Sequence, residues 1–376
     1  MIDFQKLPSP CFVLDEQLLD RNLAVIDRVR RESGAEVIVA LKACAMWSIF
    51  PELAQHSDGA TASSLAEARL VFEEFGRPAH TYAPVYTDRN IEEILDCSDH
   101  ITFNSVAQFE RFGQMALLRG ISCGLRINPG YSPVETDLYN PCVPGSRLGI
   151  PAGELKELPA GVEGLHFHVL CESRPEHLRL ALDAVEKRFG RFLDRIKWLN
   201  MGGGHLMTHK DYDCDELIRI LQEFKAKYPN LRLILEPGSA FTWRTGYLVS
   251  TVEDIVENGG VRTAMLDVSF ACHMPDCLEM PYKPAILGAR DPEPGEKGWR
   301  MGGNSCLAGD YYGDWIFDRD LRVGDRIVFE DMIHYTMVKT TMFNGVAHPA
   351  IAIVRRDGAI AVSYTHLRAH ETRHDL

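Results

Sequence analysis

The sequence predicts an α/β protein in which a TIM-like (β/α)8 barrel is followed by a β-rich domain of sandwich-like or barrel-like form. Two observations predict this architecture. Eight strand-like segments occur among helix-like segments over residues 18–242, whereas residues 243–364 are strand-like with little helical periodicity. Alternation implies parallel strands joined by helical crossovers, and eight such units in about 250 residues match a barrel. A doubly wound open sheet is the alternative, but no GxGxxG motif follows an early strand.

Hydrophobic periodicity defines the elements of the barrel. The strands are expected at EVIVALKA, DGAT, HTYAP, HITFN, SCGLRINPG, VEGLHFHVL, KWLNMGGG and LRLILEPG. The helices between them are expected at QLLDRNLAVIDRVRRES and over residues 64–75, 88–95, 105–118, 175–189 and 213–228.

The β-rich domain is expected to combine residues 1–17 with residues 243–364. Its strand-like segments, YLVSTVEDIVE, VRTAMLDVS, DRIVFED and AIAIVRRDG, are separated by Gly, Pro and Asp. The N-terminal segment PCFVLD precedes the first barrel helix, so it is expected to pair into this domain. Residues 365–376, THLRAHETRHDL, lack an apolar period and are interpreted as a non-native tail.

Composition narrows the classes of function. Hydrophobic residues make up 45% and charged residues 25% of 376, which excludes a disordered chain, a collagen-like repeat and a coiled coil. A formal charge of −13 disfavours nucleic acid or an anionic membrane as partner, and is compatible with a cationic small-molecule substrate. Ten scattered cysteines without a CxxC pair, no signal peptide and no long apolar stretch predict a cytoplasmic enzyme with reduced thiols.

Barrel enzymes carry their chemistry at the C-terminal ends of the strands. Lys42 follows the apolar run VIVAL, and a lysine that is partly removed from water becomes a nucleophile for carbonyl groups. The alternative is a lysine that only reaches to solvent. His166 and His168 are two residues apart on a strand and share one face. That spacing suits a metal site, or one imidazole lying flat on a cofactor ring; a purely structural histidine is the other interpretation for His166.

Two further strand ends predict anion and cofactor contacts. The Gly202–Gly204 triplet lets main-chain N–H groups approach an anion, and phosphate sites in barrels favour the loops after strands seven and eight. An ordinary tight turn is the alternative. Glu236 ends the apolar run LRLILE, and a buried carboxylate needs a partner. A pyridinium nitrogen would be one, and a structural ion pair is the other interpretation.

The β-rich domain adds a second group of candidates. Cys306 and Asp310 lie in the glycine-flanked segment GGNSCLAGD, where a thiol is expected to be accessible. The segment HMPDCLEMPYKP places Asp276 and Glu279 close to His273. Acidic groups beside an aromatic residue suit a polyamine-like substrate, although a solvated acidic loop is the simpler interpretation from these residues alone.

Taken together, a strand-one lysine, a strand-six HxH, a glycine triplet after strand seven and EPG after strand eight resemble one family. The chain resembles the pyridoxal-phosphate decarboxylases of the alanine-racemase-like fold, which comprise ornithine/arginine, diaminopimelate and carboxynorspermidine decarboxylases. The resemblance covers residues 8–364. Four strings make it most similar to the carboxynorspermidine and carboxyspermidine decarboxylases: YNPCVPGSRLGI, LNMGGGH, HMPDCLEMPYKP and GNSCLAGD.

This resemblance implies a role for each matching residue. Lys42 would bond the cofactor covalently, His168 would stack on its ring, and Glu236 would pair with its pyridine nitrogen. The residues that would hold the phosphate are Gly202, Gly203, Gly204, Gly238 and Tyr335. Cys306 would come from the partner subunit of a homodimer and would protonate the α-carbon. The residues implied to contact the substrate are Asp276, Asp310, Arg147, Ser239, His273 and Glu279.

Three departures from the family pattern bear on the substrate. Leu307 follows the cysteine where ornithine and diaminopimelate decarboxylases usually carry an acidic residue, which argues against both of those substrates. Leu170 and Cys171 stand where GS usually follows the FHV-type segment. Ser239 stands where close relatives often carry an acidic residue, so one substrate contact differs.

The resemblance implies decarboxylation of carboxynorspermidine or carboxyspermidine to norspermidine or spermidine, in polyamine biosynthesis. A decarboxylase for another basic amino acid or for diaminopimelate is the alternative within the same fold. A metal-dependent barrel hydrolase built on His166, His168 and a third ligand is a more distant alternative. A non-catalytic carrier of pyridoxal phosphate is also open, but such proteins are usually a barrel alone.

Overall fold

The computed structural model describes residues 2–279 and 281–363. These residues form two compact units. Residues 22–241 make up one unit, and residues 2–21 together with 242–279 and 281–363 make up the other. Helix α1 (Glu16–Ser33) contains the first boundary, so the division falls a few residues beyond the expected position after residue 17. The interpreted tail at 365–376 lies outside the described residues.

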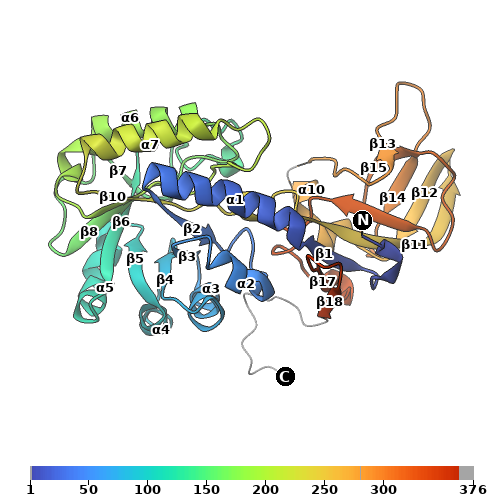
Figure 1. Cartoon of the computed structure of the whole chain (residues 1–376), viewed down its shortest axis with the longest axis horizontal. Coiled ribbons are helices and arrows are strands. Elements are labelled where there is room, and N and C mark those ends of the chain that lie inside the picture. The colour runs from blue at the N-terminus through green and yellow to red at the C-terminus, as the bar shows by residue number, and fades with distance from the viewer. Residues whose placement is uncertain (1, 280, 364–376) are drawn as a thin grey trace. The chain divides into compact units, whose positions relative to one another are not determined.

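A closed ring of parallel strands forms the unit of residues 22–241 (Figure 1). Each strand pairs with its neighbours in chain order, and β10 returns to pair with β2. In the described residues the ring contains β2 (Glu36–Ala40), β3 (Gly59–Ala62), β4 (Ala79–Tyr82), β5 (Ser98–Phe103), β6 (Ser122–Asn128), β8 (Val162–His166), β9 (Trp198–Asn200) and β10 (Arg232–Leu235). The two-residue strand β7 (Ile150–Pro151) pairs with β6 outside the ring. The (β/α)8 barrel predicted from alternation is therefore confirmed.

Helices alternate with these strands and pack outside them (Figure 1). They are α2 (Phe50–Leu53), α3 (Leu65–Leu70), α4 (Ile91–Asp96), α5 (Val106–Leu118), α6 (Pro175–Leu193), α7 (Cys214–Lys227) and α8 (Ser239–Thr242). Two helices differ from the expected ranges. The helix expected over 64–75 ends as a π-helical turn at Val71–Phe75. The helix expected from residue 88 begins at Ile91, because the Asn90 side chain accepts a hydrogen bond from the main-chain N–H of Thr87 and stabilises a turn there.

The indole of Trp198 packs inside the barrel, near the N-terminal ends of its strands. Trp198 packs with Ile38 and Ile234, and its Nε1–H donates to the hydroxyl of Ser122 at 2.9 Å. Neighbouring positions that face this ring are Gly124 and Gly164, where an added Cβ would collide with the indole. This close packing explains why Gly124 and Gly164 stand inside apolar strands, because a residue without a side chain leaves room for the indole of Trp198.

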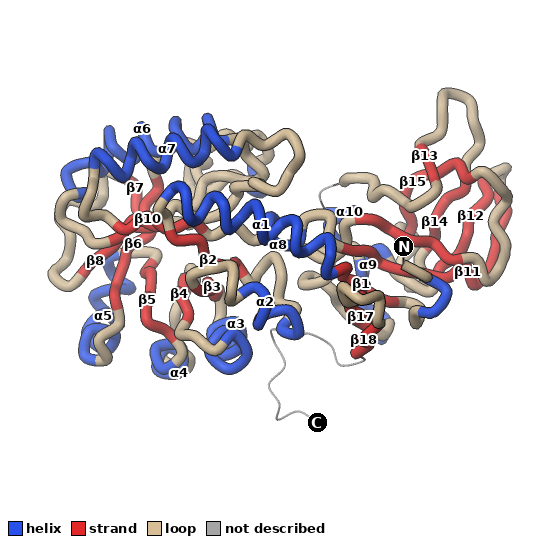
Figure 2. Tube along the Cα trace, viewed as in Figure 1, coloured by secondary structure: helices blue, strands red, loops and turns tan. Residues whose placement is uncertain are grey.

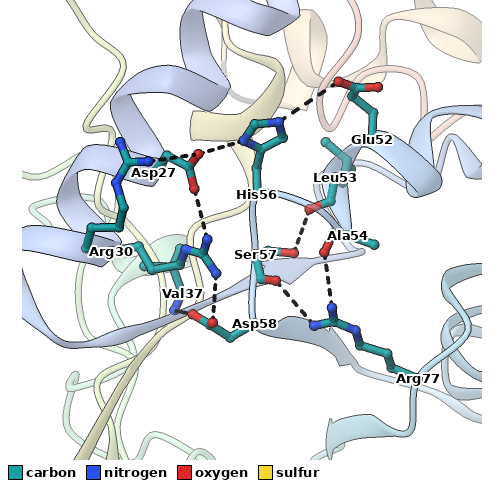
Figure 3. A network of polar contacts seen from close by, with 11 residues as sticks. Asp27, Arg30, Val37, Glu52, Leu53, Ala54, His56, Ser57, Asp58 and Arg77 are labelled. Atoms are coloured by element: carbon teal, nitrogen blue, oxygen red, sulfur yellow. Dashed lines mark hydrogen bonds and ion pairs between the residues drawn. The ribbon is translucent and has the colours of Figure 1, made fainter.

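A polar network ties α1 to the first strands of the barrel (Figure 3). Asp27 accepts from Arg30 at 3.0 Å and lies 2.9 Å from Nδ1 of His56. Asp58 accepts from Arg30 at 2.9 Å and from the main-chain N–H of Val37 at 2.8 Å. The carboxylates therefore fix the end of the helix against the beginning of β2.

The second unit is a mixed sheet (Figure 2). Its strands are β1 (Cys11–Asp15), β11 (Gly246–Asn258), β12 (Val261–Leu266), β13 (Ala289–Arg290), β14 (Trp299–Gly302), β15 (Tyr311–Phe317), β16 (Arg326–Glu330), β17 (Ala350–Val354) and β18 (Ile360–Ser363). The N-terminal strand β1 lies between β11, which is antiparallel to it, and β17, which is parallel. The segment PCFVLD thus pairs into this domain, as the sequence predicts.

Two short helices, α9 (Phe270–His273) and α10 (Pro275–Glu279), follow β12. They interrupt a region that the sequence predicts to be almost purely strand-like. Among the described residues, no helix combines the length and the apolar character that crossing a bilayer requires.

Candidate active site

The C-terminal ends of the barrel strands bring Lys42 and His168 together. Lys42 follows β2 and His168 follows β8, and Lys42 Nζ lies 3.4 Å from Nε2 of His168. Burial lowers the pKa of Lys42, and the nearby positive charge of Arg126 adds to the shift while the negative charge of Glu236 opposes it. A lysine with a lowered pKa presents a larger fraction of neutral, nucleophilic amine at physiological pH.

The ring of His168 is oriented by the glycine loop. The main-chain N–H of Gly203 donates to Nδ1 of His168 at 3.1 Å. Burial holds the pKa of His168 well below its ordinary value, and the charges of Lys42 and Arg126 push it further in that direction. A neutral ring whose Nδ1 accepts a hydrogen bond carries its proton on Nε2. The N–H of His168 therefore points at the amine of Lys42.

Glu236 is held in place as an ionised carboxylate. Asn200 Nδ2 donates to its Oε1 at 2.6 Å, and Nε2 of His166 lies 3.6 Å from its Oε2. Burial alone would raise the pKa of Glu236, but His166, Asn200 and Lys42 outweigh it and lower the pKa to about 2. The side chain is 13% exposed, so a cationic partner at its open oxygen would meet a strong, weakly screened charge.

Asn200 was not among the residues that the sequence predicted. Its amide nitrogen binds Glu236, and its carbonyl oxygen accepts from the main-chain N–H of Gly202 at 2.9 Å. One side chain thus joins the carboxylate to the glycine loop. The signal was a polar residue inside the strand string KWLNMGGG, two residues before the first glycine.

Arg126 and Tyr82 form a second group that the sequence reasoning missed. Arg126 is 5% exposed and donates to the main-chain oxygen of His168 at 3.2 Å. Its guanidinium lies 4.7 Å from the ring centroid of Tyr82, whose ring lies 5.2 Å from that of His166. The Tyr82 hydroxyl donates to Asn104 at 2.9 Å. A charged residue inside the apolar strand SCGLRIN was the available signal.

The glycine loop and the EPG turn leave no room for side chains. Gly202 and Gly204 have φ of 69° and 90°, a left-handed backbone that side chains disfavour. An added Cβ on Gly203 would collide with the main-chain oxygen of Glu236, and one on Gly238 would collide with the side chain of Ala43. The backbone therefore comes close to the strand ends, next to Ser239 at the start of α8.

The other predicted residue of this unit is Arg147, which lies in the loop before β7. Its side chain is exposed, and its main-chain oxygen accepts from Asn104 Nδ2 at 2.9 Å. Asn104 also accepts from the main-chain N–H of Gly149 and from Tyr82. The loop that carries Arg147 is thus fixed to the barrel through Asn104.

In the β domain, Cys306 and Asp310 lie in one loop after β14. The Cys306 thiol is exposed, and its main-chain N–H donates to the side chain of Asn344 at 2.9 Å. The Asp310 carboxylate is buried and accepts from the main-chain N–H groups of Ala271 and Ser305, both at 3.0 Å. Asp310 therefore shapes the loop that presents the thiol, whatever else it contacts.

The acidic segment of the β domain already holds a cation. Asp276 and Glu279 both bind the ammonium group of Lys339. His273 is fully buried, with Nδ1 accepting from the main-chain N–H of Ser269 at 3.2 Å and Nε2 lying 3.1 Å from the oxygen of Ala347.

Tyr335 has φ of 39°, a strained conformation of the kind that clusters at functional sites. The implied roles of these β-domain residues, Cys306, Asp310, Asp276, Glu279, His273 and Tyr335, stay predictions.

The histidines of the strand-six HxH do not form a metal centre among the described residues. His166 faces Glu236, and His168 faces Lys42 and Gly203. The described residues contain one group of three metal-ligating side chains, and it lies elsewhere in the barrel. The arrangement around His166 and His168 therefore gives no support to the hydrolase interpretation.

Comparison with known proteins gives a consistent result. Residues 11–333 match the model of the family described as "Pyridoxal-dependent decarboxylase, C-terminal sheet domain". The carboxyaminopropylagmatine decarboxylase of Synechocystis sp. is 55% identical over 353 residues, which are 94% of this chain and 91% of that protein. The carboxynorspermidine/carboxyspermidine decarboxylase of Campylobacter jejuni is 40% identical over 363 residues, 93% of this chain and 94% of that protein.

Solved structures agree with the sequence relatives. The crystal structure of the Campylobacter jejuni carboxynorspermidine decarboxylase complexed with norspermidine superposes with a TM-score of 0.87 at 37% identity, covering 95% of this chain and 98% of that one. A diaminopimelate decarboxylase from Helicobacter pylori superposes with a TM-score of 0.80 at 19% identity, covering 97% of this chain and 95% of that one. At this low identity the similarity shows the fold alone. The chain therefore belongs to the pyridoxal-dependent decarboxylases and is a carboxy-lyase.

Proposed function

We propose that this enzyme removes CO2 from the α-amino-carboxylate end of a carboxylated polyamine, using pyridoxal phosphate bound at Lys42. One observation carries the proposal. The mouth of the barrel contains both a partly buried lysine of lowered pKa and a carboxylate whose pKa is held at about 2. Those are the two groups that a pyridine aldehyde needs at its opposite ends: a neutral amine to bond the aldehyde and an anion beside the ring nitrogen.

The residues present fit pyridoxal phosphate. Lys42 would bond the aldehyde carbon, His168 would lie against the ring, and Glu236 would face the pyridine nitrogen. The glycine loop offers main-chain N–H groups where any Cβ would collide, which suits a phosphate. His166 is buried, and its Nε2 lies 3.6 Å from Oε2 of Glu236, so the imidazole packs against this carboxylate.

Each protein group then has a defined task. When bound, pyridoxal phosphate supplies an electron sink for the pair that is left when the bond to the carboxylate breaks. Glu236 holds a proton at the pyridine nitrogen, because its own pKa is too low to take that proton away. Asn200 and His166 keep the carboxylate oriented. Cys306 of the partner subunit would return a proton to the α-carbon.

The relatives support carboxynorspermidine and carboxyspermidine as substrates. Proteins with those names are 40% identical to this chain, and a solved relative holds norspermidine. A second candidate, carboxyaminopropylagmatine, is favoured by the 55% identity to the Synechocystis enzyme of that name. These substrates share a carboxylated aminopropyl end and differ at the far end, which is an ammonium in the first two and a guanidinium in the third.

The paired carboxylates of Asp276 and Glu279 support recognition of a cationic far end. They bind an ammonium group in this structure, that of Lys339. Two carboxylates can also accept a planar guanidinium in a bidentate fashion. We propose that this acid pair reads the far end of the substrate in competition with Lys339.

A direct comparison of substrates tests the proposal. Enzyme loaded with pyridoxal phosphate is incubated separately with carboxynorspermidine, carboxyspermidine, carboxyaminopropylagmatine and diaminopimelate, and released CO2 is measured. We expect kcat/KM to be at least about 100-fold higher for the best carboxylated polyamine than for diaminopimelate. Diaminopimelate would leave polar groups of the substrate site without partners, and this costs binding energy. Equal or greater turnover of diaminopimelate would contradict the proposal.

Assembly and location complete the proposal. We propose a homodimer whose active sites are shared across the interface, since the implied proton donor Cys306 comes from the partner. All ten cysteines carry free thiols, which supports a reducing compartment such as the cytoplasm.

A further inference from the structure

Two histidines lie side by side at the N-terminal end of the barrel. His80 on β4 and His100 on β5 are register partners on neighbouring parallel strands. Their rings stack with centroids 3.9 Å apart and planes 21° apart. The side chains are only 14% and 13% exposed. Two imidazoles are thus held together by the sheet, at the end of the barrel that is opposite to Lys42.

A β-bulge brings a carboxylate to this pair. Ala79 pairs with Ser98 and His80 pairs with His100, so Asp99 has no partner on β4. A bulge inserts one residue and re-aims its side chain. Asp99 Oδ1 lies 2.8 Å from His100 Nδ1 and 3.8 Å from His80 Nε2. An irregularity of the sheet therefore completes a three-residue group.

The group is separate from the decarboxylase site. His80 is the second residue of β4, and Tyr82 ends the strand two residues further toward the catalytic mouth. The indole of Trp198, which lies in the apolar cluster with Ile38 and Ile234, has its ring centroid 5.6 Å from that of His100. The histidine pair therefore lies next to an apolar cluster, at the end of the barrel strands opposite to Lys42.

We propose that His80, Asp99 and His100 form a binding site for a divalent transition metal of the Zn2+ type. One donor atom from each residue lies within 4.8 Å of the others. In a tetrahedral site with Zn–N and Zn–O bonds of about 2.0–2.1 Å, donor atoms are about 3.3 Å apart, so small rotations suffice. Two imidazoles and one carboxylate are a ligand set that zinc accepts, and half-exposed Asp99 leaves a fourth position for water.

The chemistry of the neighbours favours a bound cation. The side chain of His80 is only 14% exposed, and its Nε2 lies 3.8 Å from Oδ1 of Asp99. His100 Nε2 is buried without a hydrogen-bond partner among the described residues. Glu36 is engaged by the guanidinium of Arg232 at 2.7 and 2.8 Å, so it adds negative potential without acting as a ligand.

The proposed metal would act on the scaffold. It would join β4 to β5, two strands that the chain connects only through α4. Residues at this end of a barrel serve stability, whereas chemistry takes place at the other end. Metal binding to the folded chain stabilises it by mass action. Decarboxylation is therefore expected to proceed without the metal, at temperatures where the fold is intact.

Calorimetric titration of the chelator-treated holoenzyme with Zn2+ tests the proposal. We expect one equivalent per chain, and a loss of affinity of at least about tenfold in both Asp99→Asn and His100→Ala, because even supporting residues of metal sites cost that much. Asp99→Asn keeps the size of a half-exposed side chain, so its fold is expected to survive, which circular dichroism checks. The matched control is His56→Ala, which removes a histidine paired with Asp27 and Glu52 (Figure 3) and should leave the affinity unchanged.

The exposed thiols of Cys171 and Cys306 are the competing ligands, and Co2+ distinguishes them. Binding at the histidine group gives weak visible bands without sulfur-to-metal charge transfer. Strong near-ultraviolet charge transfer at one equivalent would place the metal on cysteine and overturn the proposal. So would the absence of stoichiometric binding, or equal affinity in wild type and in folded Asp99→Asn.

Discussion

Glu236 shows how one ionisable side chain can be prepared for a cofactor. Its pKa of about 2 results from a balance in which burial is outweighed by His166, Asn200 and Lys42. An ionised carboxylate is costly to bury without partners, so the barrel supplies them before the cofactor arrives. In the proposed function, the same anion would keep a proton on the pyridine nitrogen of the cofactor, which a neutral side chain could not do.

Glu236→Gln tests that role. The amide keeps the shape of the side chain but loses its charge, so we expect kcat to fall by roughly 100-fold while pyridoxal phosphate still binds. CO2 release and the visible absorbance of the bound cofactor measure the two effects separately. Glu223→Gln removes a carboxylate from the barrel surface and serves as control. Unchanged kcat in Glu236→Gln would remove Glu236 from the catalytic machinery.

The depressed pKa of Glu236 also predicts a pH effect on stability. A carboxyl whose folded pKa is below its unfolded value stabilises the protein above the unfolded value, and this contribution is lost as the pH falls through the folded value. For Glu236 the window runs from the ordinary 4.5 down to about 2. Urea unfolding at pH 7 and pH 3 should show the advantage of wild type over Glu236→Gln shrinking at pH 3. A constant difference would contradict the assigned shift.

At the scale of elements, the glycine loop after β9 is the most sharply constrained part of the site. Gly203→Ala would force a Cβ against the main-chain oxygen of Glu236. Overpacking of this kind costs about 1–3 kcal/mol, so we expect pyridoxal phosphate to bind roughly 5- to 150-fold more weakly. Equilibrium titration of the apoenzyme measures this.

Gly190 provides the matched control for that substitution. It lies in α6, and an added Cβ would meet nothing within 4 Å outside its own helix. Gly190→Ala should leave cofactor affinity unchanged and raise the free energy of unfolding by roughly 0.5–1 kcal/mol. A loss of affinity as large as that of Gly203→Ala would show that the loop has no special constraint.

The elements also show which parts of the site were predictable. Lys42, His168 and Glu236 were found because parallel strands end at one edge of a barrel, so residues at strand ends must converge. Asn200 and Arg126 were missed because their roles depend on which neighbouring side chain they reach, and strand periodicity does not encode that. The pairing of His80 with His100 depends on a bulge at Asp99, which no pattern in HITFN announces.

For the whole molecule, the sequence predicts the architecture, but it does not predict which strands of the β domain pair with each other. Alternating segments predict eight parallel strands because each must bury its apolar face under a helix. In the β domain, β1 lies beside β17, more than 300 residues later in the chain. Such contacts are decided by packing of the finished sheet, so local sequence predicts that the strand exists and leaves its neighbours open.

Complementation between inactive subunits tests the proposed dimer. If each site uses Lys42 of one subunit and Cys306 of the other, a hybrid of Lys42→Ala and Cys306→Ala subunits contains one intact site. Random mixing of the two inactive proteins should then restore about one quarter of wild-type activity. The parent dimers, unmixed, serve as controls. No recovery, with hybrid dimers verified by mass, would place each site within a single chain.

The central claim is that Lys42 carries the cofactor of a polyamine decarboxylase. The most direct test is borohydride reduction of the holoenzyme, followed by peptide mapping by mass spectrometry. We predict a pyridoxyl-phosphate adduct on the peptide that contains Lys42, with loss of CO2 release in proportion to its yield. An adduct on a different lysine, or full activity after complete modification of Lys42, would contradict the account.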